Sequence, residues 1–108
     1  MYIYNITINI DDSIHNEWLV WIETHIETVL ATGKFTSAKL TQVLVDDEVG
    51  TTYSIQYRVK IREDLDNYYK FDADKLRVEG LRKFGNKMLA FRTELKIINE
   101  FYPKSVSN

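Results

Sequence analysis

The sequence predicts an α+β sandwich, with two helices on one face of a four-stranded antiparallel sheet. Its apolar residues change from a spacing of two to helical spacing in the order strand, helix, strand, strand, helix, strand. The two halves of this order share one plan, and right-handed crossovers place both helices on the same face of the sheet. The expected order of strands across the sheet is fourth, first, third, second.

The first strand is expected over residues 1–10, where large apolar side chains alternate with smaller or polar ones. Its inner face carries Tyr2, Tyr4, Ile6, Ile8 and Ile10. Residues 11–13 (Asp-Asp-Ser) supply capping oxygens and negative charge, which favour a helix start. The helix is expected over residues 13–31 and ends near Gly33. Its apolar face carries Ile14, Trp18, Trp21, Ile22, Ile26 and Val29.

Two further strands are expected over residues 35–45 and 53–61, joined as a hairpin by the acidic turn 46–50. The second of them has the strictest alternation in the chain. Its apolar positions are Tyr53, Ile55, Tyr57, Val59 and Ile61, and its polar positions are Ser54, Gln56, Arg58 and Lys60. The tyrosines of the two middle strands are therefore expected beneath the helices.

The second helix is expected over residues 63–84, because acidic residues open it and basic residues close it. Its pattern loosens near Phe71 and Asp72, which allows a break there. The last strand is expected over residues 87–97. Residues 1–98 are expected to form one ferredoxin-like domain, and residues 99–108, which contain the only proline, a C-terminal tail.

Composition excludes several classes of protein. The chain has no cysteine, which excludes a disulfide scaffold, a Cys-ligated zinc site and thiol catalysis. Its net charge of −2 gives no basic field for nucleic acid, so no nucleic-acid partner is expected. The longest apolar run, residues 18–22, is too short to span a bilayer. Residues 1–5 lack the features of a signal peptide, so a cytoplasmic protein without a membrane partner is expected.

The sheet face away from the helices is expected to be mixed in character. Its expected members are Asn5, Thr7, Gln56, Arg58, Arg92 and Glu94, with Ile3, Leu40 and Met88 beside them. Such a face can be solvated, or it can meet a second copy of the chain across a two-fold axis. We favour a homodimer with Asn5, Gln56, Arg58 and Arg92 in the dimer face. For the two arginines, pairing with Glu94 or with the partner's acidic groups is favoured over a clamp for a carboxylate or phosphate.

His25 is the leading candidate for chemistry, because it falls on the apolar face of the first helix. A desolvated imidazole facing a pocket has a lowered pKa and can act as a general acid or base. The hydroxyls of Tyr4, Tyr53 and Tyr57 can share that pocket with Trp21 and hold a polar atom of a ligand. The alternative is a core histidine hydrogen-bonded to a tyrosine or a backbone carbonyl.

No metal site or cofactor is predicted. His15 stands near Asp11 and Asp12, but these residues lie at a helix start, where acidic caps are expected in any case. The chain also lacks the glycine motifs that cradle phosphates and the motif of a nucleophile elbow.

Five segments carry a likeness to a known family: Tyr4–Asn9, His25–Ile26, Ala31–Ser37, Thr52–Tyr57 and Arg82–Thr93. Together with Ile14, His15 and Trp18, they resemble a family of short bacterial proteins classed as a domain of unknown function, over residues 1–96. The resemblance implies the dimeric α+β barrel class, in which two ferredoxin-like sheets pack together with their helices outside.

The same class holds cofactor-independent monooxygenases, polyketide cyclases and stress-responsive proteins. Several of them use a histidine and a tyrosine between helices and sheet, which resembles the expected position of His25 and Tyr57; fold alone does not fix function. Two hypotheses follow. The first is a homodimer that is non-catalytic or binds a small ligand. The second is a small cofactor-independent enzyme acting on an aromatic or polyketide-like molecule, with His25 as acid or base.

Overall fold

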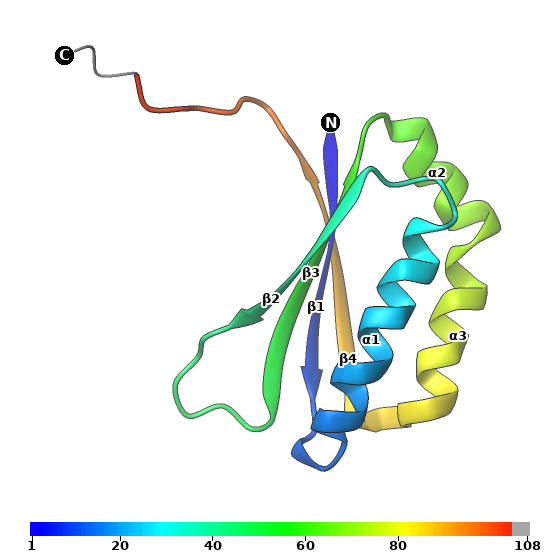
Figure 1. Ribbon diagram of the computed structural model, residues 1–108, viewed down its shortest axis with the longest axis vertical. Coiled ribbons are helices and arrows are strands. Elements are labelled where there is room, and N and C mark those ends of the chain that lie inside the picture. Colours follow the sequence, from blue (N-terminus) through cyan, green and yellow to red (C-terminus); the bar gives the residue numbers. More distant parts are fainter. Residues whose placement is uncertain (105–108) are drawn as a thin grey trace.

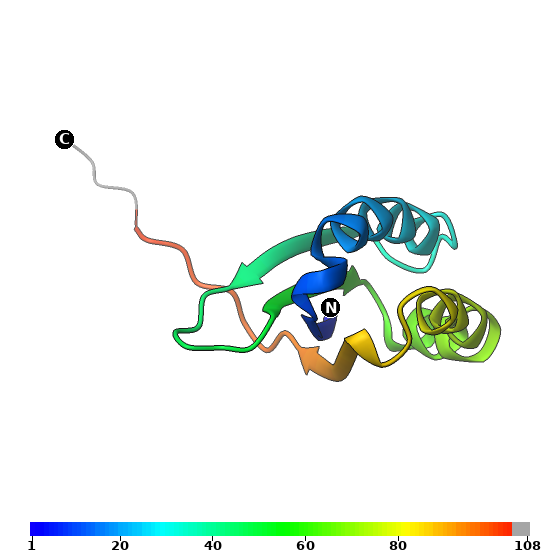
Figure 2. The ribbon, with the colours of Figure 1, turned by 90° about the horizontal axis from the view of Figure 1, so that it is seen from below.

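The structure is a computed structural model that describes residues 1–104, so the last four residues of the expected tail lie outside the described residues. In this range the chain forms one sheet with the helices on one side of it (Figures 1 and 2). The elements are β1 (Tyr2–Ile10), a 3-10 turn (Asp12–Ile14), α1 (His15–Leu30), β2 (Ser37–Val43), β3 (Thr51–Val59), α2 (Arg62–Phe71), α3 (Ala73–Phe84), a second 3-10 turn (Gly85–Lys87) and β4 (Met88–Lys96).

The sheet has the order β2-β3-β1-β4, and each neighbouring pair is antiparallel. This is the predicted order read from the other edge, so the predicted fold class is confirmed. The central pair follows the alternation of its sequence, since Tyr4 lies opposite Tyr57 and Asn5 opposite Gln56. No helix within residues 1–104 is long and apolar enough to cross a membrane.

The expected second helix is divided into α2 and α3 at Asp72, where the backbone leaves helical geometry (φ −123°, ψ −37°). The Asp72 side chain forms an ion pair of 3.1 Å with Lys34, just after α1. The break therefore lies where the sequence pattern loosens, and it is tied to the neighbouring helix.

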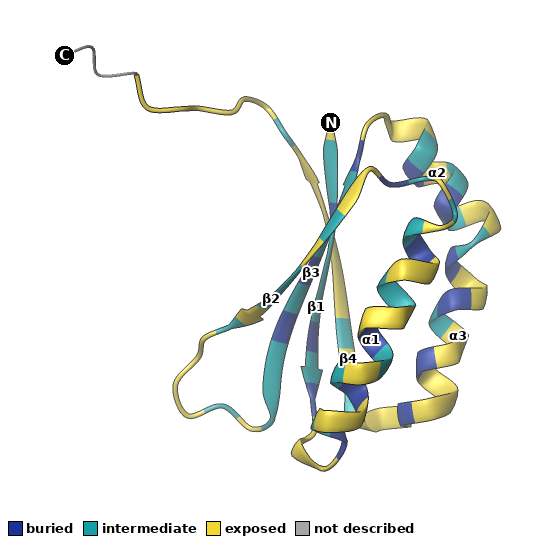
Figure 3. Ribbon diagram, in the orientation of Figure 1, coloured by how far each residue is buried: buried dark blue, intermediate teal, exposed yellow. Residues whose placement is uncertain are grey.

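The core lies between the helices and the sheet, as the dark blue segments of Figure 3 show. Trp18 on α1 is fully buried, and its indole Nε1 donates to the Met88 sulfur at 3.2 Å. Tyr4 and Tyr57 from the two middle strands are each 1% exposed. Burial of these large rings supplies much of the apolar area that stabilises a domain of this size.

The inner and outer faces of β4 are the reverse of those predicted. Its register with β1 places Arg92 opposite Ile6 and Glu94 opposite Tyr4, so both charged side chains lie on the helix side. The prediction that Arg92 and Glu94 lie on the open face is therefore wrong. Met88 was also expected on the open face, and it likewise lies on the helix side, opposite Ile10. The open face of β4 instead carries Leu89, Phe91, Thr93 and Leu95. Leu40 of β2 also faces the helices, because it lies opposite Ile55.

This error has a physical cause. β4 is an edge strand with one neighbour, and its apolar residues are not all beneath the helices. Hydrophobic alternation identifies two faces of a strand but decides which is inner only where one face is clearly buried. Hydrogen bonding to β1 settles the facing here, and it leaves Phe91 68% exposed.

After β4, residues 97–104 form no helix or strand and run away from the body of the molecule (Figure 1). Figure 2 shows this arm leaving on the side of the sheet opposite to the helices. Glu100 in the arm pairs with Arg58 on the open face at 3.0 Å. Arg58 therefore pairs with the arm, and Glu94 pairs with Arg62 at 2.8 Å.

Candidate functional site

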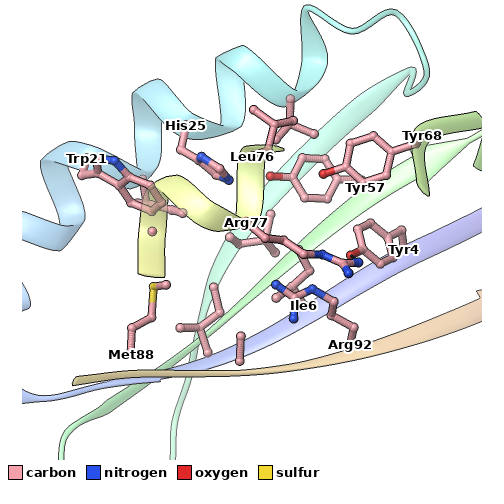
Figure 4. A pocket seen from close by; sticks show the side chains of 16 residues that line it. Tyr4, Ile6, Trp21, His25, Tyr57, Tyr68, Leu76, Arg77, Met88 and Arg92 are labelled. Carbon is pink, nitrogen blue, oxygen red and sulfur yellow. Dashed lines mark hydrogen bonds between the residues drawn. The ribbon is translucent and has the colours of Figure 1, made fainter. Parts of the chain in front are cut away.

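A pocket lies between α1, α3 and the sheet, and the space between its walls measures about 500 Å³, including the part that opens to solvent. The enclosed part of this space is small, about 40 Å³, so a ligand with a ring would also occupy the part that opens to solvent. Figure 4 shows the side chains that line it. They are Tyr4, Ile6, Ile8, Trp21, Ile22, His25, Val29, Ile55, Tyr57, Tyr68, Leu76, Arg77, Gly80, Met88, Ala90 and Arg92.

His25 reaches this pocket from α1, one turn after Trp21, and the two rings stack with centroids 4.5 Å apart. Its Nδ1 is buried and has no hydrogen-bond partner in the described part of the chain. Burial lowers the pKa of the imidazole below its ordinary value, and the nearby charge of Glu79 opposes this only in part. His25 is therefore a neutral imidazole at pH 7, and its Nδ1 is free to donate or accept a hydrogen bond according to the tautomer.

Tyr57 faces the same space from β3. Its hydroxyl is buried and unpartnered among residues 1–104, and burial raises the pKa of the phenol. Figure 4 shows this hydroxyl and the His25 imidazole pointing into one space. Tyr68 of α2 adds a further ring, and burial raises its pKa to about 12. The phenols stay protonated at neutral pH and can donate a hydrogen bond.

Arg77 enters from α3 and donates from Nη2 to the Tyr4 hydroxyl at 2.9 Å. Its Nε is buried and lacks a partner in the described residues. Arg92 comes from β4, on the opposite wall, and lines the same pocket. Figure 4 shows the two guanidinium groups reaching toward one end of it.

Gly80 keeps α3 close to the pocket wall. A Cβ at this position would lie 2.8 Å from the Met88 methyl group and 3.2 Å from the Trp21 ring. A larger residue there would push against the ring that stacks on His25, so the glycine contributes to the position of both side chains.

The structure places four of the residues proposed from sequence around one cavity, namely Tyr4, Trp21, His25 and Tyr57. Tyr53 is not among the lining residues. Its hydroxyl contacts the His15 imidazole at 2.6 Å, and its ring lies 5.0 Å from the Trp18 ring. Asp11, considered with His15 as a metal ligand, accepts a hydrogen bond from the Ser13 backbone at 2.9 Å, as a cap does.

Arg77, Tyr68 and Arg92 were missed as pocket residues by the sequence reasoning. Arg77 carried a usable signal, because it continues the inward spacing of Ala73, Gly80 and Phe84 along α3. A basic residue on the inner stripe of a helix is unusual, since charged side chains are rarely buried without a partner. Tyr68 and Arg92 needed the actual break in the helix and the register of β4.

The stability of the protein is expected to fall as the pH drops from about 7 through 6.5, in part because of His25. The unfolded chain binds a proton on His25 near pH 6.5, whereas burial keeps the imidazole neutral in the folded state to lower pH. Protonation therefore favours the unfolded chain. Urea unfolding at pH 7 and pH 5.5 checks this, and the His25→Gln variant should show a smaller drop. An identical drop in both proteins would contradict the burial of a neutral imidazole.

The pH window separates His25 from the carboxylates. Hydrogen bonds from Arg62 and Tyr69 lower the pKa of Glu94 below 4.5, so the stability that this group contributes is lost only below that pH. A drop above pH 5 that disappears in the glutamine variant thus reports on the imidazole.

Several solved structures share the fold. A dimeric ferredoxin-like protein from an uncultured marine organism matches with a TM-score of 0.72 at 11% identity, covering 93% of this chain and 97% of that one. An ethyl tert-butyl ether D (EthD) family protein from Bacillus halodurans matches with a TM-score of 0.65 at 11% identity, covering 86% and 97%. A de novo designed protein with a ferredoxin fold matches with a TM-score of 0.50 at 17% identity, covering 98% and 94%.

Comparison by sequence gave one match, to a family model. Comparison with curated proteins gave no match. One family model, described as a domain of unknown function (DUF4286), matches residues 1–98. This match covers all the strands and helices of the structure, from β1 to β4. The chain therefore belongs to the DUF4286 family.

Proposed function

We propose that the protein binds a small molecule in the pocket between α1, α3 and the sheet, without catalysing a reaction of it. One observation carries this proposal: His25 Nδ1, the Tyr57 hydroxyl and Arg77 Nε are buried without a partner in residues 1–104, and all three residues line one cavity. A buried polar atom left without a hydrogen bond costs about 1–3 kcal/mol. A bound molecule or ordered water that meets these atoms removes that cost.

The wall of the pocket favours a ligand with an aromatic or other flat apolar body, which includes polyketide-like molecules. Apolar side chains from the sheet and both helices surround it, and the rings of Trp21, Tyr57 and Tyr68 offer flat faces. Such a ligand buries its body against these groups and directs its few polar atoms at the unpartnered ones.

Native mass spectrometry of freshly purified protein tests the proposal, and a retained small molecule is the expected result. Tyr57→Phe and His25→Gln should each reduce its occupancy. The matched control is His15→Gln, because His15 lies outside the pocket and contacts Tyr53. Removing the Tyr57 hydroxyl should leave the ligand-free protein as stable as before or about 1 kcal/mol more stable. A loss of stability in Tyr57→Phe with unchanged occupancy would contradict a binding role for this group.

We also propose that the chain forms a homodimer through the open face of the sheet. Leu89, Phe91 and Leu95 are exposed there, at 54%, 68% and 42%. The arm beyond β4 adds Phe101 and reaches out on the same side (Figure 2). A second copy covers this apolar area, with Asn5, Gln56 and Arg58 at the polar part of the contact. The marine protein with the same fold is described as dimeric, which supports the proposal.

A cofactor-independent enzyme of monooxygenase or cyclase type is the second candidate, and the state of His25 favours it. A neutral imidazole with a free Nδ1, in a pocket with the Tyr57 hydroxyl, is equipped to take a proton from a bound molecule. If the retained molecule carries an acidic C–H, the wild-type protein should exchange that hydrogen with deuterated water, and His25→Gln should bind it without exchange. Equal exchange in both proteins would exclude His25 as the base.

A further inference from the structure

Two cations share the pocket without a matching anion. Arg77 and Arg92 both line it, and none of the 16 lining residues is acidic. Both guanidinium groups act on the same phenol, because each lowers the pKa of Tyr68 against the effect of burial. Arg77 is half-buried and Arg92 is exposed, so solvent screens part of the repulsion between their charges, and an anion at the mouth of the pocket would favour both.

Two acidic groups near the arginines are engaged elsewhere, and Glu79, whose charge acts on His25, does not line the pocket. Glu94, two residues after Arg92 on the same face of β4, accepts hydrogen bonds from Arg62 at 2.8 Å and from the Tyr69 hydroxyl at 2.6 Å. Asp72 pairs with Lys34 at 3.1 Å. Within residues 1–104, neither Arg77 nor Arg92 forms an ion pair. The positive charges of Arg77 and Arg92 are thus available to an anion bound in the pocket.

The geometry points to a small carboxylic acid as the ligand, with its carboxylate held by Arg77 and Arg92 and its apolar body against the inner wall of the pocket. This inference rests on the proposed binding function and names the class of ligand. A guanidinium group offers a flat pair of donors that matches a carboxylate, and the free Nε of Arg77 is one such donor. The hydrogen bond to Tyr4 holds the Arg77 side chain in place before the ligand arrives.

The other lining residues indicate the chemistry of the ligand beyond its carboxylate. Apolar side chains such as Ile6 and Met88 surround the body of the acid. His25 Nδ1 and the Tyr57 hydroxyl are free to meet a second polar atom, such as a hydroxyl or keto oxygen. A hydroxy or keto acid with a ring satisfies both ends of the pocket.

Benzoate and its neutral analogue benzamide test the assignment by titration calorimetry. Benzoate should bind at least about tenfold more tightly than benzamide, because only the acid pairs with the two cations. Raising the salt concentration from about 50 to about 500 mM should weaken the binding of benzoate and leave that of benzamide unchanged. Inorganic phosphate is the second arm of the experiment. Tighter binding of phosphate than of benzoate would show that the head group is a phosphate and overturn the carboxylate assignment.

Arg92→Met is the informative variant, because the Arg92 side chain forms no hydrogen bond or ion pair among the described residues and its loss leaves no partner behind. The affinity for benzoate should fall about tenfold or more. The melting temperature without ligand should stay the same or rise, since one of two like charges is removed. Arg77→Met should weaken binding as well. Arg58→Met is the matched control, because Arg58 lies on the open face and pairs with Glu100.

The outcomes separate this inference from the proposed function. Equal affinities for benzoate and benzamide, or an unchanged benzoate affinity in Arg92→Met, overturn the acid site, while a retained neutral molecule would still support small-molecule binding. If neither benzoate nor benzamide binds, the assignment of an acid with an aromatic body is also overturned. Loss of the retained molecule in Arg92→Met, with normal retention in Arg58→Met, supports it independently of any probe.

Discussion

Phe91→Glu is expected to turn the proposed dimer into a monomer. Phe91 lies on the open face of β4, and 68% of it is exposed in the single chain. A second copy on this face would bury the ring, and a glutamate there would bury an unpaired charge at the contact. Sedimentation equilibrium at micromolar concentration should give twice 12.8 kDa for the wild-type protein and 12.8 kDa for the variant.

Val20→Glu is the matched control for this experiment. Val20 is a similarly exposed apolar residue at 75%, but it lies on α1, on the helix side of the sheet. This variant should remain a dimer, because the same added charge lies in solvent. A wild-type mass of 12.8 kDa, or dissociation of both variants alike, would contradict a dimer formed through the open face.

Trp18→Ala should lower the free energy of unfolding by about 3–5 kcal/mol, which is a large part of the stability of a typical domain. Trp18 is fully buried between α1 and the sheet, where its ring lies 5.0 Å from that of Tyr53 and its indole donates to the Met88 sulfur. Truncation leaves a cavity that the surrounding strands cannot fill. Guanidinium unfolding followed by circular dichroism measures the loss.

Trp18→Phe keeps much of the apolar volume and loses the indole donor, so its loss should be less than half as large. If the alanine variant loses less than about 1 kcal/mol, the site can collapse around the missing ring, and Trp18 is not the anchor of the helix layer. Neither substitution changes a residue that lines the pocket, so comparison of the two variants reports on packing.

The central strands show how much of this fold could be predicted from sequence. In β1 and β3 one face is apolar and the other is largely polar, and the structure places Tyr4 and Tyr57 inside and Asn5 and Gln56 outside, as predicted. The position of His25 on the inner side of α1 likewise follows from helical spacing beside Trp21. Local periodicity sufficed in these elements because burial on one side leaves a clear pattern.

The pocket shows where that reasoning stops. Arg77, Arg92 and His25 come from α3, β4 and α1, and no spacing along the chain brings them together. Tyr53 has the same alternation as Tyr57, yet it contacts His15 at the other end of β3. The distance between two residues on different elements depends on strand register and helix placement, which sequence patterns within one element do not contain.

The amino-acid sequence by itself determined which elements form and in what order, and which faces of the two middle strands are inner, because local periodicity carries this information. It also determined the order of the strands in the sheet, because crossovers are right-handed. Only the tertiary structure decided which side of β4 is inner, and hence that Arg92 joins Arg77 within the molecule while Phe91 faces outward. The apolar side of β4 points away from the helices, so its alternation indicated the wrong inner face, and hydrogen bonding to its one neighbour fixed the facing instead.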